Sequence, residues 1–393
     1  MKFKRVKLKE IGEIVGGGTP STKNKSYYGG NISWITPKDL SKNKSKYIYR
    51  GERNITYEGL INSSAKILPK GTVLFSSRAP IGYVAIAAKD LSTNQGFKSI
   101  VPGSEIDNEF LYYLLIHNRD TIKNLGSGST FKEVSGKTMK NIEVLLPEMD
   151  VQLKISLLLS LLDKKIEVNN KIIANLEEQA QAIFKSWFVD FEPFQDGNFV
   201  ESELGMIPEG WEVKELGDFI PVVTGKKNAN IANDNGEYPF FTCSQEIFKT
   251  DDYSFDANAI LLAGNGDFNV KRYNGKFEAY QRTYVLIPKN EKHVGWLYNL
   301  IKYFLRDIVS GYKGSVINYI TKGMIENFKI AVPRNIDELN VLSIFNDFEL
   351  MISNINNENK KLAGIRDALL PKLMSGEIDV SNIKIKGEEV KNE

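Results

Sequence analysis

Apolar residues recur at alternating spacings of four and three between Asp150 and Trp187. The positions on this seam are Ile155, Leu159, Leu162, Ile166, Asn169, Ile173, Leu176, Ala180, Ile183 and Trp187. Such a spacing is a heptad repeat, with Lys, Glu and Asn between the seam positions. No proline or glycine interrupts the stretch, so it predicts one helix roughly 55 Å long, which needs a partner helix to cover its apolar face.

A second copy of this pattern lies between Asp337 and Leu373. Each of its seam positions follows its counterpart by the same offset in residue number: Val341, Phe345, Phe348, Ile352, Ile355, Asn359, Leu362, Arg366, Leu369 and Leu373. The two helices are therefore predicted to be a repeat and to pack on each other. Antiparallel pairing would bring Asn169 and Asn359 face to face, and such a polar pair fixes the register of a seam. The alternative is that both asparagines lie on the rim of the helices.

The repeat extends beyond the helices, because Gln95 to Trp187 aligns without a gap onto Gln281 to Leu373. In the first half, short β-rich runs punctuated by Gly, Pro and Asn precede a helix signal at 105–125 and a closing strand at 140–147. We expect an α+β fold in which two mixed α/β domains in tandem repeat are each followed by a long helix. The two helices would form an antiparallel coiled coil with pseudo-two-fold symmetry. The expected boundaries are 1–149 for the first domain, 150–190 for its helix, 191–208 for a linker, 209–333 for the second domain, 334–375 for its helix and 376–393 for a tail.

The composition is that of an ordinary globular protein, with 42% hydrophobic and 25% charged residues in a chain of 393. The formal net charge is only +2, so a surface for nucleic acid would have to be local. A single cysteine, Cys243, fits a reducing compartment. The first residues lack the apolar core of a signal peptide, and no apolar run is long enough to span a membrane. We expect a cytoplasmic, non-membrane protein.

Motifs for catalysis are missing from the chain. Two histidines, His117 and His293, and one cysteine cannot form a zinc site or a Cys–His nucleophile pair. The SGKT run at 135–138 would need a glycine where Phe131 stands, and GGGTP at 16–20 would need one where Ser21 stands, so neither is a nucleotide-binding loop. The Asn/Asp-Pro-Pro-aromatic signature of an amino-methyltransferase is absent too. We expect no metal, no cofactor and no catalytic residue in this chain.

Basic and amide side chains instead concentrate in loops of both halves. Lys and Arg neutralise phosphates, whereas Arg, Asn, Gln and Ser can also read base edges. For any single residue the ordinary interpretation is a solvated surface charge. The interpretation as a DNA contact is favoured only because both halves place such residues in matching loops. The candidate DNA-binding residues are Thr19, Lys23, Lys25, Lys38, Ser76, Ser77, Arg78, Gln95, Ser129, Lys226, Lys227, Asn265, Lys271, Arg272, Gln281, Arg282, Lys313 and Ser315.

Several phrases of the sequence resemble the specificity subunit of type I restriction–modification enzymes. They are SSRAPIG at 76–82, KSWFVDFEP at 185–193, SELGMIPEGWEV at 202–213 and RDALLPKLMSGEI at 366–378. The first half lacks the PEGW opening that the second half has at 208–211, which leaves the start of the first domain less sharply marked.

The resemblance implies that each domain is a target-recognition domain that reads one half of a bipartite site in double-stranded DNA. It also implies that the helices set the spacing between the half-sites and that two methyltransferase subunits dock on them. Those subunits would bind S-adenosylmethionine and methylate adenine. Restriction subunits would bind ATP and Mg, and they would translocate and cut DNA. Half-sites one turn apart, ~34 Å, would lie within reach of the predicted helices.

Two other functions remain open at this point. The chain could be a scaffold or adaptor whose domains bind proteins, in which case association would be insensitive to salt, unlike binding to a duplex. An enzyme with an atypical active site is the third possibility. The sequence does not distinguish a type I subunit from similar specificity subunits of related systems.

Overall fold

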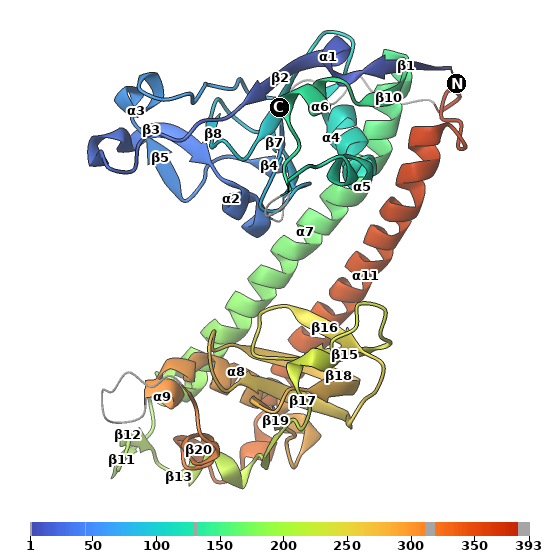
Figure 1. The fold of residues 1–393 in the computed structure, drawn as a ribbon. Helices are drawn as coiled ribbons and strands as arrows, with labels where there is room; N and C mark the ends of the chain where they lie inside the picture. The colour runs from blue at the N-terminus through green and yellow to red at the C-terminus, as the bar shows by residue number, and fades with distance from the viewer. Residues whose placement is uncertain (1, 44, 129–131, 311–318, 384–393) are drawn as a thin grey trace. The chain divides into compact units, whose positions relative to one another are not determined.

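The computed structural model describes residues 2–43, 45–128, 132–310 and 319–383. The chain forms two compact units (Figure 1). Unit 1 comprises Met1–Asn170 and Glu358–Glu393, and unit 2 comprises Lys171–Asn357. Each unit thus contains one globule together with a half of each long helix.

The globule of unit 1 is built on a five-stranded sheet of order β2-β9-β6-β7-β4 and a three-stranded sheet of order β5-β3-β8. β1 and β10 form a separate antiparallel pair. The strands are β1 (Phe3–Lys7), β2 (Gly12–Gly16), β3 (Tyr28–Ile35), β4 (Tyr47–Ile48), β5 (Arg53–Ile55), β6 (Val73–Phe75), β7 (Val84–Ala87), β8 (Ser92–Thr93), β9 (Lys98–Pro102) and β10 (Glu143–Pro147). The helices are α1 (Leu8–Ile11), α2 (Pro37–Lys42), α3 (Tyr57–Ile61), α4 (Asn108–His117), α5 (Arg119–Asn124) and α6 (Gly136–Lys140).

The globule of unit 2 has a six-stranded sheet of order β14-β19-β17-β18-β15-β16, the antiparallel pair β13-β20 and the hairpin β11-β12. The strands are β11 (Phe199–Ser202), β12 (Gly205–Pro208), β13 (Trp211–Glu215), β14 (Val222–Thr224), β15 (Tyr238–Phe241), β16 (Ile247–Thr250), β17 (Phe255–Ala263), β18 (Val270–Ala279), β19 (Thr283–Leu286) and β20 (Lys329–Pro333). The helices are α8 (Val294–Tyr303), α9 (Leu305–Ser310) and α10 (Lys322–Glu326).

The predicted repeat is confirmed strand by strand. The order β2-β9-β6-β7 in unit 1 returns as β14-β19-β17-β18 in unit 2. The parallel pairing of β3 with β8 returns as that of β15 with the end of β18, whose residues 278 and 279 follow 92 and 93 by the offset of the seam positions. β10 and β20 are related by the same offset as the seam positions, and they close their globules against β1 and β13 in the same antiparallel register. The backbone N–H of Leu8 donates to Ile142 O at 3.0 Å, and that of Leu216 donates to Phe328 O at 2.9 Å. The two globules are therefore copies of one fold.

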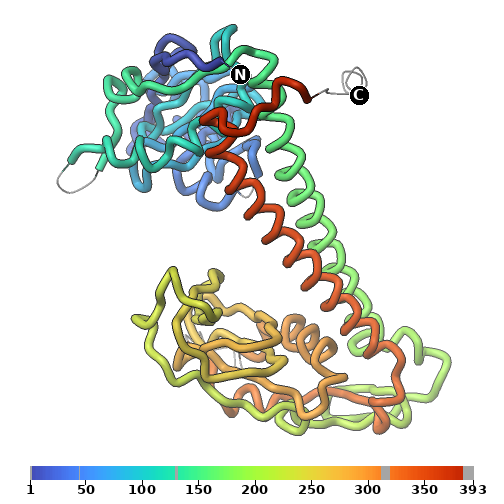
Figure 2. The backbone as a smooth tube through the Cα atoms, turned by 90° about the vertical axis from the view of Figure 1, so that its right-hand side faces the viewer, coloured from blue at the N-terminus to red at the C-terminus, as the bar shows by residue number. Residues whose placement is uncertain are grey.

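The long helices are α7 (Met149–Phe188) and α11 (Val341–Ser375). Within each unit the two helices run side by side, as both backbone views show (Figures 1 and 2). In unit 1 Asp163 of α7 accepts a hydrogen bond from Arg366 of α11 at 2.8 Å. Val151 and Ile155, nearer the start of α7, pack in the same core as Leu373, nearer the end of α11. Residue numbers thus rise along one helix as they fall along the other, and the pairing is antiparallel as predicted.

The polar pair predicted for the seam is present. The side-chain amide of Asn169, which is 1% exposed, donates to Asn359 Oδ1 at 2.8 Å and to Glu358 Oε2 at 2.7 Å. Asn359 in turn donates to Asn170 Oδ1 at 3.0 Å. Among the apolar seam positions, Ile155, Leu159, Val341 and Phe345 are buried, and Leu162, Ile166, Phe348 and Ile352 are half-buried.

The second helix and the linker differ from what the sequence predicts. The second helix begins at Val341 rather than at residue 334, because Asp337 accepts hydrogen bonds from Asn290 and His293 and holds a short turn against the globule. The linker 191–208 is not featureless either. It forms a short helical turn at Glu192–Phe194 and then the hairpin β11-β12.

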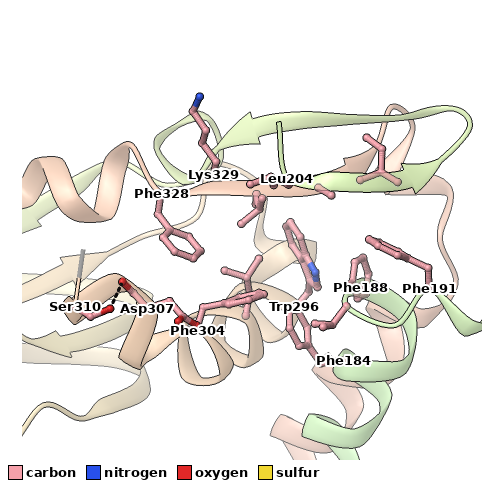
Figure 3. Close-up of a pocket in the computed structure, with 15 residues that line it drawn as sticks. Phe184, Phe188, Phe191, Leu204, Trp296, Phe304, Asp307, Ser310, Phe328 and Lys329 are labelled. Carbon is pink, nitrogen blue, oxygen red and sulfur yellow. Dashed lines mark hydrogen bonds between the residues drawn. The ribbon is translucent and has the colours of Figure 1, made fainter. Parts of the chain in front are cut away.

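The end of α7 packs into an aromatic core of unit 2. Phe188 lies within stacking distance of Trp211, Trp296 and Phe345, with ring centroids 5.6–6.4 Å apart. These contacts leave a cavity of about 430 Å³, around which Figure 3 shows Phe184, Phe188, Trp296, Phe304 and Phe328. Burial of these large rings fixes the globule of unit 2 to the helix that leads into it.

A polar network fixes the globule of unit 1 to α7. Glu109 of α4 accepts hydrogen bonds from Lys46 at 2.8 Å, from Ser160 of α7 at 2.5 Å, and from Tyr47. Burial alone would raise the pKa of Glu109, but the hydrogen bonds from these three donors outweigh it and hold the pKa below its ordinary value. Glu109 is therefore an ionised carboxylate whose charge the fold satisfies.

Candidate nucleic-acid interface

Four segments of unit 1 meet at one edge of its sheets. We call residues 17–20, 35–38, 76–82 and 94–97 the loop edge of unit 1. Gly18 N–H donates to Thr93 O at 2.9 Å, and Asn94 N–H donates to Ile35 O at 2.9 Å. Ser77 N–H donates to Gly96 O at 2.7 Å. These backbone bonds hold the segments together at the ends of β2, β3, β6 and β8.

Several of the candidate residues lie at this edge and are exposed to solvent or contact one another. Gln95 is exposed, and its Oε1 accepts a hydrogen bond from the Thr19 hydroxyl. Lys38 is exposed at the start of α2, 3.2 Å from Glu52. Together with Asn94 and Arg78, it lines a surface groove of about 470 Å³. Lys23 and Lys25 are also exposed, but they lie on the segment between β2 and β3 and do not line this groove.

Arg78 is half-buried and paired inside the protein. Its guanidinium lies 3.5 Å from Glu133, which Lys98 also approaches at 3.1 Å. Glu133 therefore neutralises part of the positive charge that the sequence places in the loop after β6. Arg78 remains about one third exposed and stays a candidate.

Ser76 and Ser77 do not face solvent, which corrects their prediction as contact residues. Both are 0% exposed. The Ser76 hydroxyl donates to Pro80 O at 2.8 Å and accepts from Tyr83 N–H at 2.8 Å. The Ser76 hydroxyl therefore holds the 76–82 loop in shape, and neither serine presents its hydroxyl group to a ligand. Ser129 lies outside the described residues.

The same arrangement recurs in unit 2. We call residues 225–228, 242–246, 264–271 and 280–282 the loop edge of unit 2. Gln281 N–H donates to Lys227 O at 3.0 Å, and Gly264 N–H donates to Arg282 O at 2.9 Å. Cys243 Sγ also donates to Arg282 O, at 3.3 Å. The segments that follow β14, β15 and β17 thus meet the segment that precedes β19.

Most of the candidates of unit 2 lie on this edge. Lys226, Gln281 and Arg282 are exposed, and Lys227 and Asn265 are half-buried. Lys271 turns inward and donates to Ser244 O at 2.6 Å, and its burial lowers the pKa of its ammonium group. Lys313 and Ser315 lie outside the described residues.

Arg272 is a structural residue, which corrects the prediction that it binds DNA. Its guanidinium lies 3.3 Å from Glu349 of α11 and its Nε donates to Asn258 Oδ1 at 3.2 Å. Both members of the ion pair are largely buried, at 16% and 11% side-chain exposure. Burial raises the pKa of Glu349 although Arg272 opposes the shift. The pair joins β18 to the long helix, facing away from solvent.

Two glycines support the loop edges, and no sequence pattern marks either of them as important. A Cβ on Gly17 would lie 2.0 Å from Asn94 O, and one on Gly225 would lie 2.1 Å from Ala279 O and 2.5 Å from Tyr280 O. Tyr280 corresponds to Asn94 in the repeat, so the two glycines make the same close approach in both units. The glycine-rich run at 16–20, which is no nucleotide-binding loop, is therefore explained by packing.

The described residues contain neither a metal cluster nor a membrane-spanning helix. No three or more His, Cys, Asp or Glu side chains among them are placed to hold a metal ion. No helix within the described ranges is both long and apolar enough to cross a membrane.

Comparison with known proteins gives consistent matches along the chain. The family model for the type I restriction modification DNA specificity domain matches residues 1–178 and again 208–363. The chain is 39% identical over 413 residues to the type I restriction enzyme MjaIX specificity subunit of Methanocaldococcus jannaschii, with 96% of this chain and 94% of that protein covered. It is 27% identical over 444 residues to the HindI specificity subunit of Haemophilus influenzae, covering 88% and 94% of the two chains.

A solved structure supports the fold. The crystal structure of the S subunit of a type I restriction–modification system from M. genitalium aligns with a TM-score of 0.58 at 17% identity, and the alignment covers 95% of this chain and 96% of that one. At this identity the likeness concerns the fold alone. The family model matches both repeats, and the M. jannaschii relative is matched over nearly its whole length. The chain therefore belongs to the type I restriction–modification DNA specificity family, as a specificity subunit with two copies of the specificity domain.

Proposed function

We propose that this chain is the sequence-specific DNA-binding subunit of a methyltransferase and endonuclease complex, and that it recognises a target in two parts. Each globule reads one half-site through its loop edge, and the two antiparallel helices set the spacing between the half-sites. The chain itself carries no catalytic residue in this scheme.

The observation that carries the proposal is the repetition of the loop edge. Both units gather loops from the same strand ends and fix them with equivalent backbone hydrogen bonds, and both place exposed basic and amide side chains there. Basic groups contact phosphates and position a protein on DNA, and amide groups read base edges. Two copies of such an edge in one chain fit a target that is read in two halves.

Chemistry is supplied by partner subunits in this proposal. Two methyltransferase subunits bind S-adenosylmethionine and methylate adenine, one in each half-site, and they must extrude the adenine from the duplex to reach it. Restriction subunits add ATP- and Mg-dependent translocation and cleavage. The specificity subunit contributes binding free energy and register to both activities.

Co-expression with the methyltransferase subunit in a methylation-free host tests the proposal. N6-methyladenine mapped along the host genome should reveal a two-part motif with a fixed spacer. Exchange of residues 1–149 for those of another specificity subunit should change one half-site, and exchange of 209–333 should change the other. An exchange of the first globule that alters both half-sites would refute this division.

The same experiment separates the proposal from a protein-binding scaffold. A soluble complex that co-purifies with the methyltransferase but neither methylates DNA nor binds a duplex in a salt-sensitive way would favour the scaffold.

A further inference from the structure

We propose that Gln95 and Gln281 are base-reading residues, and that each recognises the adenine of an A·T pair at the equivalent position of its half-site. This inference rests on the proposed function and names the base pair that both loop edges read.

The two glutamines occupy the same place in the fold. Gln281 corresponds to Gln95 in the repeat, and each lies in the short segment that leads into the strand, β9 or β19, that pairs with β6 or β17. The residue after each glutamine accepts an equivalent backbone hydrogen bond, from Ser77 N–H at 2.7 Å in unit 1 and from Gly264 N–H at 2.9 Å in unit 2.

A second anchor holds each glutamine from the other side. Gly17 and Gly225 pack directly on the backbone that precedes the glutamine, with no room for a Cβ. Two positions after each glycine, the chain contacts the glutamine itself. The Thr19 hydroxyl donates to Gln95 Oε1, and Lys227 O accepts from Gln281 N–H at 3.0 Å. Each glutamine thus stands on a backbone that is fixed by two neighbouring loops.

The repeat changes the other described candidates and keeps the glutamine. Thr19 is replaced by Lys227, and Gly96 by Arg282. Arg78, whose charge Glu133 partly neutralises, has no arginine at the corresponding place in the 264–269 loop. Both glutamines are exposed. Among the described candidates on the two loop edges, the glutamine is therefore the same residue in both units, is exposed, and stands on a fixed backbone.

The amide group of glutamine suits adenine in the major groove. Its Nε2–H donates to N7 and its Oε1 accepts from the N6 amino group, a bidentate pairing that disfavours other bases about ten-fold or more. Thr19 occupies one lone pair of Gln95 Oε1, which leaves the second lone pair and both Nε2 hydrogens for the base. The adenine that is read must differ from the adenine that is methylated, because the methylated base leaves the stack.

The test uses the complex with the methyltransferase subunit and maps N6-methyladenine for the wild type and for Gln95→Ala and Gln281→Ala. The wild-type motif should contain an A·T pair at the same distance from the methylated adenine in both half-sites. Gln95→Ala should relax this position to any base in one half-site alone, and Gln281→Ala should relax it in the other. Gln195→Ala, an exposed glutamine in the linker, should leave the motif unchanged.

Two further variants keep the test decisive if an alanine variant does not assemble. Gln95→Glu removes the donor to N7 and should shift the preference at that position towards C·G, because a carboxylate accepts from the cytosine amino group. Thr19→Val removes the hydroxyl that donates to Gln95 Oε1, and it should weaken the discrimination between bases at the same position. The second half-site should keep its preference and serves as an internal control.

Three results would count against the inference. They are an unchanged motif in both alanine variants, a relaxed position that was not A·T, and a uniform loss of methylation at all sites without a change of motif. If the wild-type complex gives no two-part motif at all, the proposed function fails first, and that result is distinct from the other three.

Discussion

Gly17 shows how closely the loops of unit 1 approach one another. A Cβ at this position would lie 2.0 Å from Asn94 O and 2.5 Å from Thr93 O, both of them backbone atoms that cannot rotate away. A Cβ on Gly16, its neighbour in β2, would have no atom within 4 Å. The pair offers a matched comparison at two adjacent positions.

Gly17→Ala should separate the 17–20 segment from the 94–97 segment and weaken DNA binding. Overpacking of this kind costs about 1–3 kcal/mol of unfolding free energy. The expected result is a lower duplex affinity of the methyltransferase complex, measured by fluorescence anisotropy. Variants of unit 2 should leave the recognition of the first half-site unchanged. Gly16→Ala is the control and should bind like the wild type. Equal affinities for the two variants would show that the close approach does not matter for the interface.

The residue scale is where prediction from sequence is least complete. Ser76 and Arg272 carry the right chemistry for DNA, yet Ser76 is wholly buried and Arg272 pairs with Glu349, which lies far along the chain in α11. Side-chain direction at the end of a strand depends on distant contacts that no local pattern reveals. The sequence places Gln95 and Gln281 at equivalent positions before a strand, where either could be structural; both are exposed, and their role in binding DNA stays a prediction.

Asn169 and Asn359 form a hydrogen-bonded pair in the seam between α7 and α11. Asn169→Leu would leave Asn359 Oδ1 without its donor inside the seam, at a cost of about 1–3 kcal/mol of unfolding free energy. Asn169→Leu combined with Asn359→Leu should recover most of this loss, because both partners of the hydrogen bond are then apolar. Urea unfolding of all four forms gives the coupling energy between the positions. Strictly additive effects would contradict a direct interaction.

Glu109 couples α4 to α7 and makes the attachment sensitive to acid. A carboxylate whose pKa is depressed in the folded state stabilises the fold above its unfolded pKa, and it loses this effect as the pH falls through the folded pKa. The wild type should therefore exceed Glu109→Gln in unfolding free energy by about 1.5–3 kcal/mol near neutral pH. This difference should shrink as the pH falls below about 4.5.

Urea unfolding at a series of pH values measures that difference. Glu178→Gln is a suitable control, because Glu178 is exposed on α7. A gap between wild type and Glu109→Gln that stays constant into acid would mean that Lys46, Ser160 and Tyr47 do not stabilise the ionised form.

The elements themselves differ in how well the sequence predicts them. α7 and α11 were predictable because their seam spacing persists along the whole of each helix. The hairpin β11-β12 was not, because its two strands are short and Gly205 and Pro208 indicate a loop. The early start expected for the second helix was wrong because the hydrogen bonds of Asp337 to Asn290 and His293 are long-range.

At the scale of the whole molecule, the net charge of +2 means that affinity for DNA must come from local groups. The repeat was visible in the sequence because a single offset relates ninety-odd positions. The equivalence of the loops in the two halves was not visible in the same way. The segments 17–20 and 225–228 are not related by this offset in residue number. Only the structure shows that they occupy equivalent places in the loop edges of the two units.

Salt dependence separates phosphate contacts from base contacts across the whole complex. The logarithm of the duplex affinity should fall linearly with the logarithm of salt concentration, by roughly 0.9 per phosphate contact. Lys226 is exposed on the loop edge of unit 2, so Lys226→Ala should weaken binding to all sequences alike and reduce this slope by about one. Gln281→Ala should keep the slope and change the sequence preference instead.

Lys292 provides the matched control for Lys226. It is also exposed, but it lies beyond the end of β19, whereas the loop edge includes the residues 280–282 that precede this strand. Lys292→Ala should therefore leave both the slope and the affinity as in the wild type. If Lys292→Ala lowered the slope as much as Lys226→Ala, phosphate contacts would not be concentrated at the loop edge, and the assignment of this edge as the DNA-facing surface of unit 2 would be wrong.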